Sequence, residues 1–133
     1  MALVIRRRYD VECAHHLTAG VPGDHKCRRL HGHRYEIEIA VSGGIDRDGM
    51  IIEYDTLDAA VLPILDLIDH RDLNTLADRC ASAEAMEVSA NPTVERLASW
   101  LVGRLARAVA TGTCGLEWLT VREDARSAVE WRP

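Results

Sequence analysis

The amino-acid sequence predicts a single α+β domain over residues 1–133, with elements in the order ββααββ. Three observations predict this class. Residues 3–41 contain two runs of alternating apolar and polar side chains, residues 55–110 contain two runs with apolar residues three and four apart, and residues 116–132 return to short alternating runs. A chain of 133 residues is long enough to bury one core, so we expect these elements to pack together.

The first two elements are expected to be strands. Odd positions carry most of the apolar side chains in residues 3–15 and again in residues 31–41, where Arg34, Glu36 and Glu38 lie on the opposite face. A loop rich in Gly, Pro and charge separates the runs, and the turn sequence SGGIDRDG follows the second. The polar face would line a hydrated barrel interior or face bulk solvent, and both fit the pattern.

The third element is expected to be a helix. Asp55 is a suitable N-cap for the apolar stripe that runs from Leu57 to Ile68. Pro63 lies inside this run and should bend the helix or disturb its hydrogen bonds locally, because it cannot donate a backbone hydrogen bond. Residues 75–90, which follow, are expected to form a loop with one short helix.

The fourth element has a clearer helical signature. Asn91 can cap it, Pro92 fits its first turn and Gly112 can end it. Residues 116–123 and 127–132 then read as two final strands joined by a tight connection.

Charge and composition limit the classes of function. The formal net charge is -5 and the sequence pI about 5.6, which argues against a general nucleic-acid binder. The basic run Arg6-Arg7-Arg8 is too short to change this expectation. Neither a membrane segment nor a signal peptide is apparent at MALVIRRRYD, so we expect a cytoplasmic protein.

The four cysteines are expected to be reduced thiols. Cytoplasmic proteins rarely hold disulfides, and a four-cysteine zinc site would need closely spaced pairs. Here the cysteines are scattered, at Cys13, Cys27, Cys80 and Cys114. Disulfide and zinc-finger explanations of the stretch CRRLHGH at 27–33 are therefore excluded.

Three histidines are candidate metal ligands. His31 and His33 share a face of their strand because side chains at i and i+2 point the same way. On the first strand the apolar parity selects His15 and leaves out His16. If the strands pair, three imidazoles converge and leave one position open, which is the arrangement of catalytic zinc. An isolated His-x-His pair is also common on ordinary surfaces, and this alternative stays open.

Cys27, Glu123 and the pair Asp69-His70 are further candidates. Cys27 lies four residues before His31 and could be a zinc ligand, a buried small hydrophobe or a reactive thiol whose cationic neighbours favour the thiolate. Asp69-His70 could equally place a histidine at a helix C-terminus. Glu123 shares the parity of buried strand residues, so its carboxylate needs an ion-pair partner or a ligand with parallel N–H donors.

Six stretches of the chain resemble, in order, the family of 6-pyruvoyltetrahydropterin synthase and 6-carboxytetrahydropterin synthase. The resemblance covers nearly the whole chain, and Cys-x-x-x-His-Gly-His is similar to the bacterial carboxy-forming branch, which feeds 7-deazaguanine and queuosine synthesis. The stretches are AHHL at 14–17, CRRLHGH at 27–33, GMIIEYDTL at 49–57, LIDHRDLN at 67–74, NPTVE at 91–95 and TVRE at 120–123.

This resemblance implies a fold, an assembly and a set of site residues. The fold would be the tunnelling fold, a four-stranded antiparallel sheet with two helices on one face. Three subunits would join their sheets into a barrel, and two trimers would stack into a homohexamer with active sites between subunits. The implied roles are zinc ligand for His15, His31 and His33, catalytic thiol for Cys27, acid–base pair for Asp69 and His70, pterin anchor for Glu123 and substrate contact for Thr93.

The substrate implied by the resemblance is 7,8-dihydroneopterin triphosphate. Zinc (Zn²⁺) would polarise its side-chain oxygens, Cys27 would move protons and Glu123 would hold the pterin edge. We therefore expect a zinc-dependent 6-carboxytetrahydropterin synthase that releases acetaldehyde and triphosphate, takes a small-molecule pterin and binds neither nucleic acid nor membrane. Two alternatives stay open: pyruvoyl-forming activity on the same substrate, and a non-catalytic assembly protein that binds zinc or pterin.

The chain departs from the family pattern most clearly in residues 75–90. The link between Leu73-Asn74 and Asn91-Pro92-Thr93 is about ten residues longer than is usual in the family. If this segment borders the site, the choice of substrate could differ.

Overall fold

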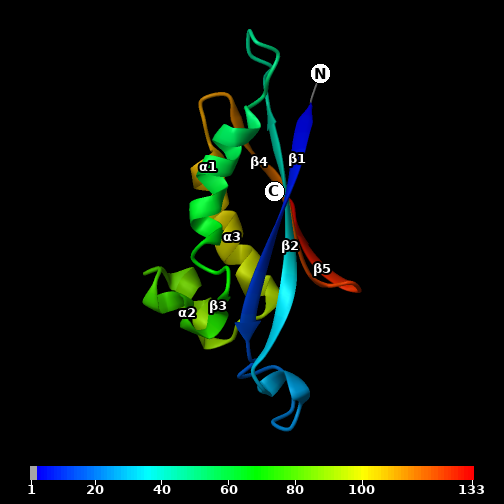
Figure 1. The fold of residues 1–133 in the computed structure, drawn as a ribbon, viewed down its shortest axis with the longest axis vertical. Helices are drawn as coiled ribbons and strands as arrows, with labels where there is room; N and C mark the ends of the chain where they lie inside the picture. The colour runs from blue at the N-terminus through cyan, green and yellow to red at the C-terminus, as the bar shows by residue number, and fades with distance from the viewer. Residues whose placement is uncertain (1–2) are drawn as a thin grey trace.

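The computed structural model describes residues 3–133, which form a five-stranded sheet in the order β3-β1-β2-β4-β5 (Figure 1). The expected α+β class is confirmed, but the sheet has one strand more than expected. The extra strand, β3, has only two residues and pairs in parallel with the end of β1. The strands are β1 Val4–His15, β2 His31–Gly43, β3 Arg71–Asp72, β4 Cys114–Asp124 and β5 Ser127–Trp131.

The central strand β2 pairs antiparallel with β1 and with β4. Its register with β1 is unbroken from Val4 opposite Ser42 to His15 opposite His31. Its pairing with β4 shifts at a bulge between Ala40 and Val41, and β5 closes the far edge by pairing with β4. The unbroken register matters for function because it places the ends of β1 and β2 side by side.

Three helices, α1 Tyr54–Leu65, α2 Ala83–Ala90 and α3 Val94–Val109, lie on one face of the sheet (Figure 1). Helix α2 is the short helix expected within residues 75–90, and a 3-10 helix over Leu73–Asp78 precedes it. No helix in the described part of the chain is long and apolar enough to cross a membrane.

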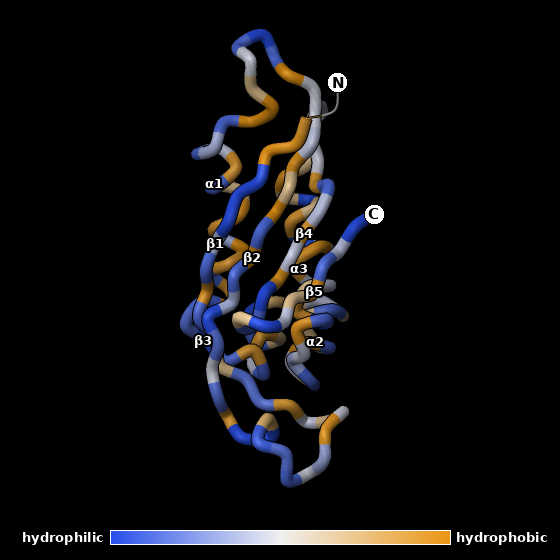
Figure 2. The backbone as a smooth tube through the Cα atoms, turned by 90° about the vertical axis from the view of Figure 1, so that its right-hand side faces the viewer, coloured by the Kyte–Doolittle hydropathy of each residue, from blue (hydrophilic) through white to orange (hydrophobic). Residues whose placement is uncertain are grey.

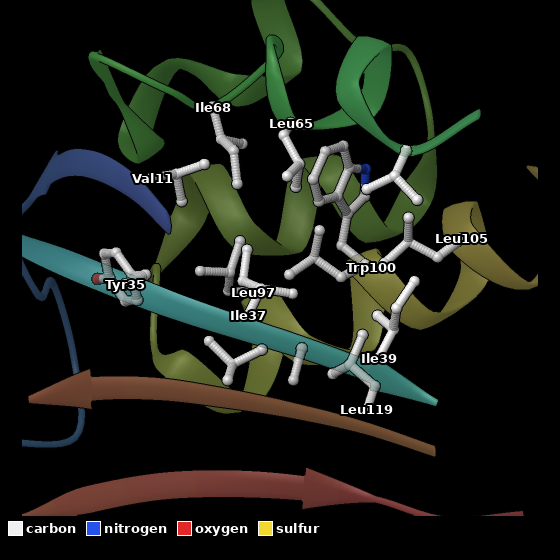
Figure 3. Packing of buried hydrophobic residues seen from close by; sticks show 14 of the residues in the cluster. Val11, Tyr35, Ile37, Ile39, Leu65, Ile68, Leu97, Trp100, Leu105 and Leu119 are labelled. Atoms are coloured by element: carbon white, nitrogen blue, oxygen red, sulfur yellow. The ribbon is translucent and has the colours of Figure 1, made fainter. Parts of the chain in front are cut away.

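The core fills the space between the helices and the apolar face of the sheet (Figure 3). Ile37 and Ile39 of β2 point toward Leu97 and Trp100 of α3, and all four are buried. The tube coloured by hydropathy shows hydrophobic and hydrophilic residues following one another along β1 and β2 (Figure 2). Period-two alternation therefore divides the sheet into a helix-covered face and a polar face.

Both helix caps differ from expectation. The N-cap of α1 is Glu53, whose carboxylate accepts hydrogen bonds from the backbone N–H groups of Asp55 and Thr56, so Asp55 lies inside the first turn. The N-cap of α3 is Thr93, whose hydroxyl accepts from Arg96 N. Asn91 instead ends α2, because its N–H already bonds to the carbonyl of that helix's last turn.

Helix α1 is also shorter than its apolar stripe. It ends at Leu65, two residues after Pro63, and continues as a series of turns through Ile68. Ile68 is still fully buried, so the stripe predicted burial correctly beyond the end of the helix.

An ion pair joins α1 to β1. The guanidinium of Arg7 donates two hydrogen bonds to the carboxylate of Asp58, at 2.6 and 2.7 Å, and the hydroxyl of Tyr9 donates a third at 2.7 Å. These bonds, chiefly the one from Arg7, lower the pKa of Asp58 from 3.8 to about 2. Arg7 is the one cation among the otherwise apolar positions of β1, and the Asp58 carboxylate neutralises its charge.

Candidate active site

Three imidazoles meet where β1 ends and β2 begins. His15 lies opposite His31 in the strand register, and His33 lies two residues further along β2 on the same face. One ligand atom from each of the three lies within 4.8 Å of the others, and the ring centroids are 4.5 to 5.0 Å apart. The structure thus brings together the three histidines that strand parity selected.

Backbone carbonyls orient two of the rings. Nδ1 of His15 lies 2.8 Å from the carbonyl oxygen of Pro92, and Nδ1 of His31 lies 2.7 Å from that of Arg29. A carbonyl only accepts hydrogen bonds, so each Nδ1 carries a proton, and in the neutral ring the lone pair lies on Nε2. This is the orientation that metal-ligating histidines usually have.

The burial of His15 favours its neutral form. Its side chain is 2% exposed, and this desolvation lowers its pKa below 6.5, partly offset by the Pro92 carbonyl and reinforced by His31 and His33. A metal ligand must be neutral imidazole. The protein therefore keeps this ring in the state that metal binding needs.

Two ring nitrogens of the histidine cluster are buried and have no hydrogen-bond partner in the described part of the chain. Nε2 of His15 and Nε2 of His33 are both unsatisfied within residues 3–133. Oε1 of Glu123, on β4, lies 3.1 Å from the His33 atom and 3.9 Å from the His15 atom but accepts a hydrogen bond from neither. Orphaned polar atoms are costly, and a metal ion would satisfy both. Three imidazoles suit zinc and several other transition metals.

A cavity of about 160 Å³ adjoins the histidine cluster. Its wall combines Cys27, Thr93 (the N-cap of α3) and Glu123 of β4. The lining residues are His15, Leu17, Cys27, His31, Thr93, Val94, Glu95 and Glu123. The sequence reasoning missed Glu95, although its position two residues after Thr93, in the first turn of α3, was a usable signal.

Asp69 and His70 lie outside this cavity. His70 is 73% exposed and has a φ of 57°, in the left-handed region that non-glycine residues rarely adopt. Its ring lies between two carboxylates, 3.0 Å from Asp69 Oδ1 and 3.3 Å from Glu12 Oε2. Since α1 already ends at Leu65, His70 is not at a helix C-terminus.

Hydrogen bonds favour the ionised form of the Asp69 carboxylate. Oδ1 accepts the backbone N–H of Glu12 at 2.9 Å, and this bond, helped by the adjacent His70, lowers the pKa of Asp69. His70 borders an open depression whose walls also include His33 and Arg34. Within one chain, Asp69 and His70 therefore do not share the cavity of Cys27.

Comparison with known proteins identifies relatives along the whole chain. A 6-carboxy-5,6,7,8-tetrahydropterin synthase from Synechocystis is 29% identical over 136 residues, which cover 96% of this chain and 92% of that protein. A dihydroneopterin monophosphate aldolase from Pyrococcus furiosus is 30% identical over 101 residues, or 76% of each chain. The structure of Caenorhabditis elegans 6-pyruvoyl tetrahydropterin synthase superposes with a TM-score of 0.80 at 20% identity, covering 100% of this chain and 96% of that one.

These comparisons confirm the expected tunnelling fold. The family model described as 6-pyruvoyl tetrahydropterin synthase matches residues 4–133, which include every site residue discussed above. The chain therefore belongs to the 6-pyruvoyl tetrahydropterin synthase family.

Proposed function

We propose that this protein is a zinc-dependent 6-carboxytetrahydropterin synthase. It would convert 7,8-dihydroneopterin triphosphate to 6-carboxy-5,6,7,8-tetrahydropterin, acetaldehyde and triphosphate, in 7-deazaguanine or queuosine-type biosynthesis. The observation that carries the proposal is the convergence of three histidines next to a cavity lined by Cys27, Thr93 and Glu123.

The site residues divide the work of binding and proton transfer. His15, His31 and His33 would hold zinc, which when bound supplies a Lewis acid for the oxygens of the substrate side chain. The Cys27 thiolate would move protons at the side-chain carbons. Glu123 would accept the 2-amino and ring N–H groups of the pterin and so fix its register, with Thr93 as a second contact.

Asp69 and His70 would act on Cys27 of a neighbouring subunit. Within one chain His70 is exposed and backbone-strained, and strain of this kind persists only where the surrounding structure enforces it. We therefore propose that active sites form between subunits of a homohexamer built from two trimers. All four cysteines are free thiols, which supports a cytoplasmic location.

Three alternatives compete with this proposal. The C. elegans structure is of a 6-pyruvoyl tetrahydropterin synthase, and the P. furiosus relative is a dihydroneopterin monophosphate aldolase. A non-catalytic zinc- or pterin-binding assembly protein is the third. Four relatives named 6-carboxy-5,6,7,8-tetrahydropterin synthase, from Synechocystis, Haemophilus influenzae and two Rickettsia species, favour the carboxy product.

Product analysis separates these possibilities. Purified protein loaded with zinc is incubated with 7,8-dihydroneopterin triphosphate, and separately with dihydroneopterin monophosphate, and the products are identified by mass spectrometry. We expect 6-carboxytetrahydropterin and acetaldehyde from the triphosphate. The pyruvoyl product, turnover of the monophosphate alone, or pterin binding without turnover would each replace our proposal with the corresponding alternative.

Light scattering tests the assembly independently. We expect a particle of six chains in solution. A sample that is active as a monomer would contradict the placement of active sites between subunits.

A further inference from the structure

The segment that carries Cys27 has little packing of its own. Residues 16–30, here called the Cys27 loop, connect β1 to β2 and extend beyond the end of the sheet (Figure 1). Their one regular element is a 3-10 helix over Lys26–Arg28, none of whose residues is buried. Because such a loop lacks a core, polar contacts must determine where its thiol lies.

One side chain outside the loop makes several of these contacts. Asn91 Oδ1 accepts hydrogen bonds from the backbone N–H groups of Thr18, at 2.9 Å, and Ala19, at 3.4 Å. Its Nδ2 donates to the carbonyl of Ala19 at 3.3 Å, and the Thr18 hydroxyl donates to the carbonyl of Ala90 at 2.5 Å. The side-chain amide of Asn91 thus pairs with the backbone of the loop, as the backbone of an adjacent strand would.

Thr18 and Ala19, which Asn91 holds, are connected to Cys27 through further hydrogen bonds. The N–H of Leu17, next to Thr18, donates to the carbonyl of Cys27 at 2.8 Å. The guanidinium of Arg28 donates to the carbonyls of Thr18 and Val21. The two ends of the Cys27 loop are therefore tied to each other at the point that Asn91 holds.

The two residues after Asn91 belong to the site itself. The carbonyl of Pro92 accepts from Nδ1 of His15, and Thr93 both caps α3 and lines the cavity. Three consecutive residues thus contact the thiol loop, a candidate metal ligand and the cavity wall. A displacement of the loop relative to this segment would move Cys27 relative to the histidines.

We propose that Asn91 is a positioning residue that holds the Cys27 loop in register with the histidine cluster. This inference rests on the proposed function of Cys27. The side chain of Asn91 touches neither cavity nor histidines, so it acts through the backbone of Thr18 and Ala19. Its removal should misplace the thiol and leave the imidazoles, which their own strands hold, in place.

The test combines kinetics, thiol chemistry and metal content of the zinc-loaded enzyme. For Asn91→Ala we expect kcat to fall by about 10²-fold, as a misplacement of about 1 Å can cost, while KM and zinc content stay close to wild type. Alkylation of Cys27 by iodoacetamide, followed by peptide mass spectrometry, should become several-fold faster because the loop opens more often. The other cysteines, Cys13, Cys80 and Cys114, are buried and serve as internal references.

Matched variants at Thr18 separate positioning from a general loss of structure. Thr18→Val removes the hydroxyl that bonds to Ala90, so it should lower kcat in the same direction, and Thr18→Ser should restore it. Ser42→Ala, which removes a hydrogen bond to Glu117 far along β2, is the control expected to behave as wild type. If Asn91→Ala fails to fold, the comparison of Thr18→Val with Thr18→Ser tests the inference instead.

Two outcomes would overturn the inference. One is a wild-type kcat and alkylation rate in Asn91→Ala, and the other is loss of zinc in parallel with activity, which would place the effect on the metal ligand. The alkylation measurement needs no turnover. If Cys27→Ala proves fully active, the thiol's catalytic role fails while the alkylation rates still report whether Asn91 holds the loop.

Discussion

The ion pair between α1 and β1 offers a prediction whose size can be worked out from the structure. Asp58→Asn keeps the volume of the side chain and an oxygen that can accept from Arg7 or Tyr9, but removes the charge. Lowering the pKa of Asp58 from 3.8 to about 2 corresponds to about 2 kcal/mol before solvent screening is considered. The Asp58 and Arg7 side chains are 22% and 34% exposed, so solvent screening reduces the expected loss of unfolding free energy to about 1 kcal/mol.

The pH dependence of this contribution has a definite sign. The folded-state pKa of Asp58 lies below the unfolded value, so the unfolded chain binds more protons in the window between them. Wild-type stability from this pair should be complete above about pH 5 and should disappear as pH falls from 3.8 toward 2. The difference between wild type and Asp58→Asn should shrink over the same window.

Urea unfolding measures this difference directly. Metal-free protein at one fixed concentration removes the contributions of metal binding and of changing assembly. Asp78→Asn is the matched control, because Asp78 is exposed and makes no side-chain hydrogen bond or ion pair within the described residues. Parallel stability curves for wild type and Asp58→Asn between pH 5 and 2 would refute the reasoning.

Further predictions concern the site. Cys27→Ala should reduce turnover by about 10²–10⁴-fold with zinc retained, and unchanged turnover would remove the thiol from the mechanism. His31→Ala should lose its metal on dialysis, as measured by elemental analysis, whereas His16→Ala, off the ligand face, should keep it. Burial raises the pKa of the Cys13 thiol to about 12, so Cys13→Ser should leave the alkylation of native protein at pH 8 unchanged; a lower yield would show that Cys13 is accessible.

Strand parity identified the histidine cluster because it depends on local geometry alone. Side chains at i and i+2 share a face in any strand, so the apolar positions of β1 and β2 were enough to select His15, His31 and His33. Burial was likewise predictable, as Ile68 shows. The two-residue strand β3 was not, since no periodicity can develop over so short a stretch.

Helix boundaries and loop contacts required the tertiary structure. Asn91 and Pro92 have the residue types of a helix start, yet Thr93 is the cap of α3. What decides between them is where α2 ends, and α2 lies in a segment whose sequence pattern was ambiguous. The contacts of Asn91 with the Cys27 loop join residues more than seventy positions apart, so no local pattern encodes them.

The sheet has a helix-covered apolar face and a polar face, and this division determines the location of the site as well as that of the core. The apolar face of β2 runs through Ile39, Ile37 and Tyr35, all buried, and continues into His33 and His31 where helix cover ends. Burial at this border keeps His15 neutral and deprives its Nε2 and that of His33 of hydrogen-bond partners. A core residue with that deficit would destabilise the fold, whereas the same deficit beside a cavity could be satisfied by a bound cation. The free energy lost at this border in the metal-free protein would therefore be regained if a metal ion bound there, which is what our proposal of a metal site predicts.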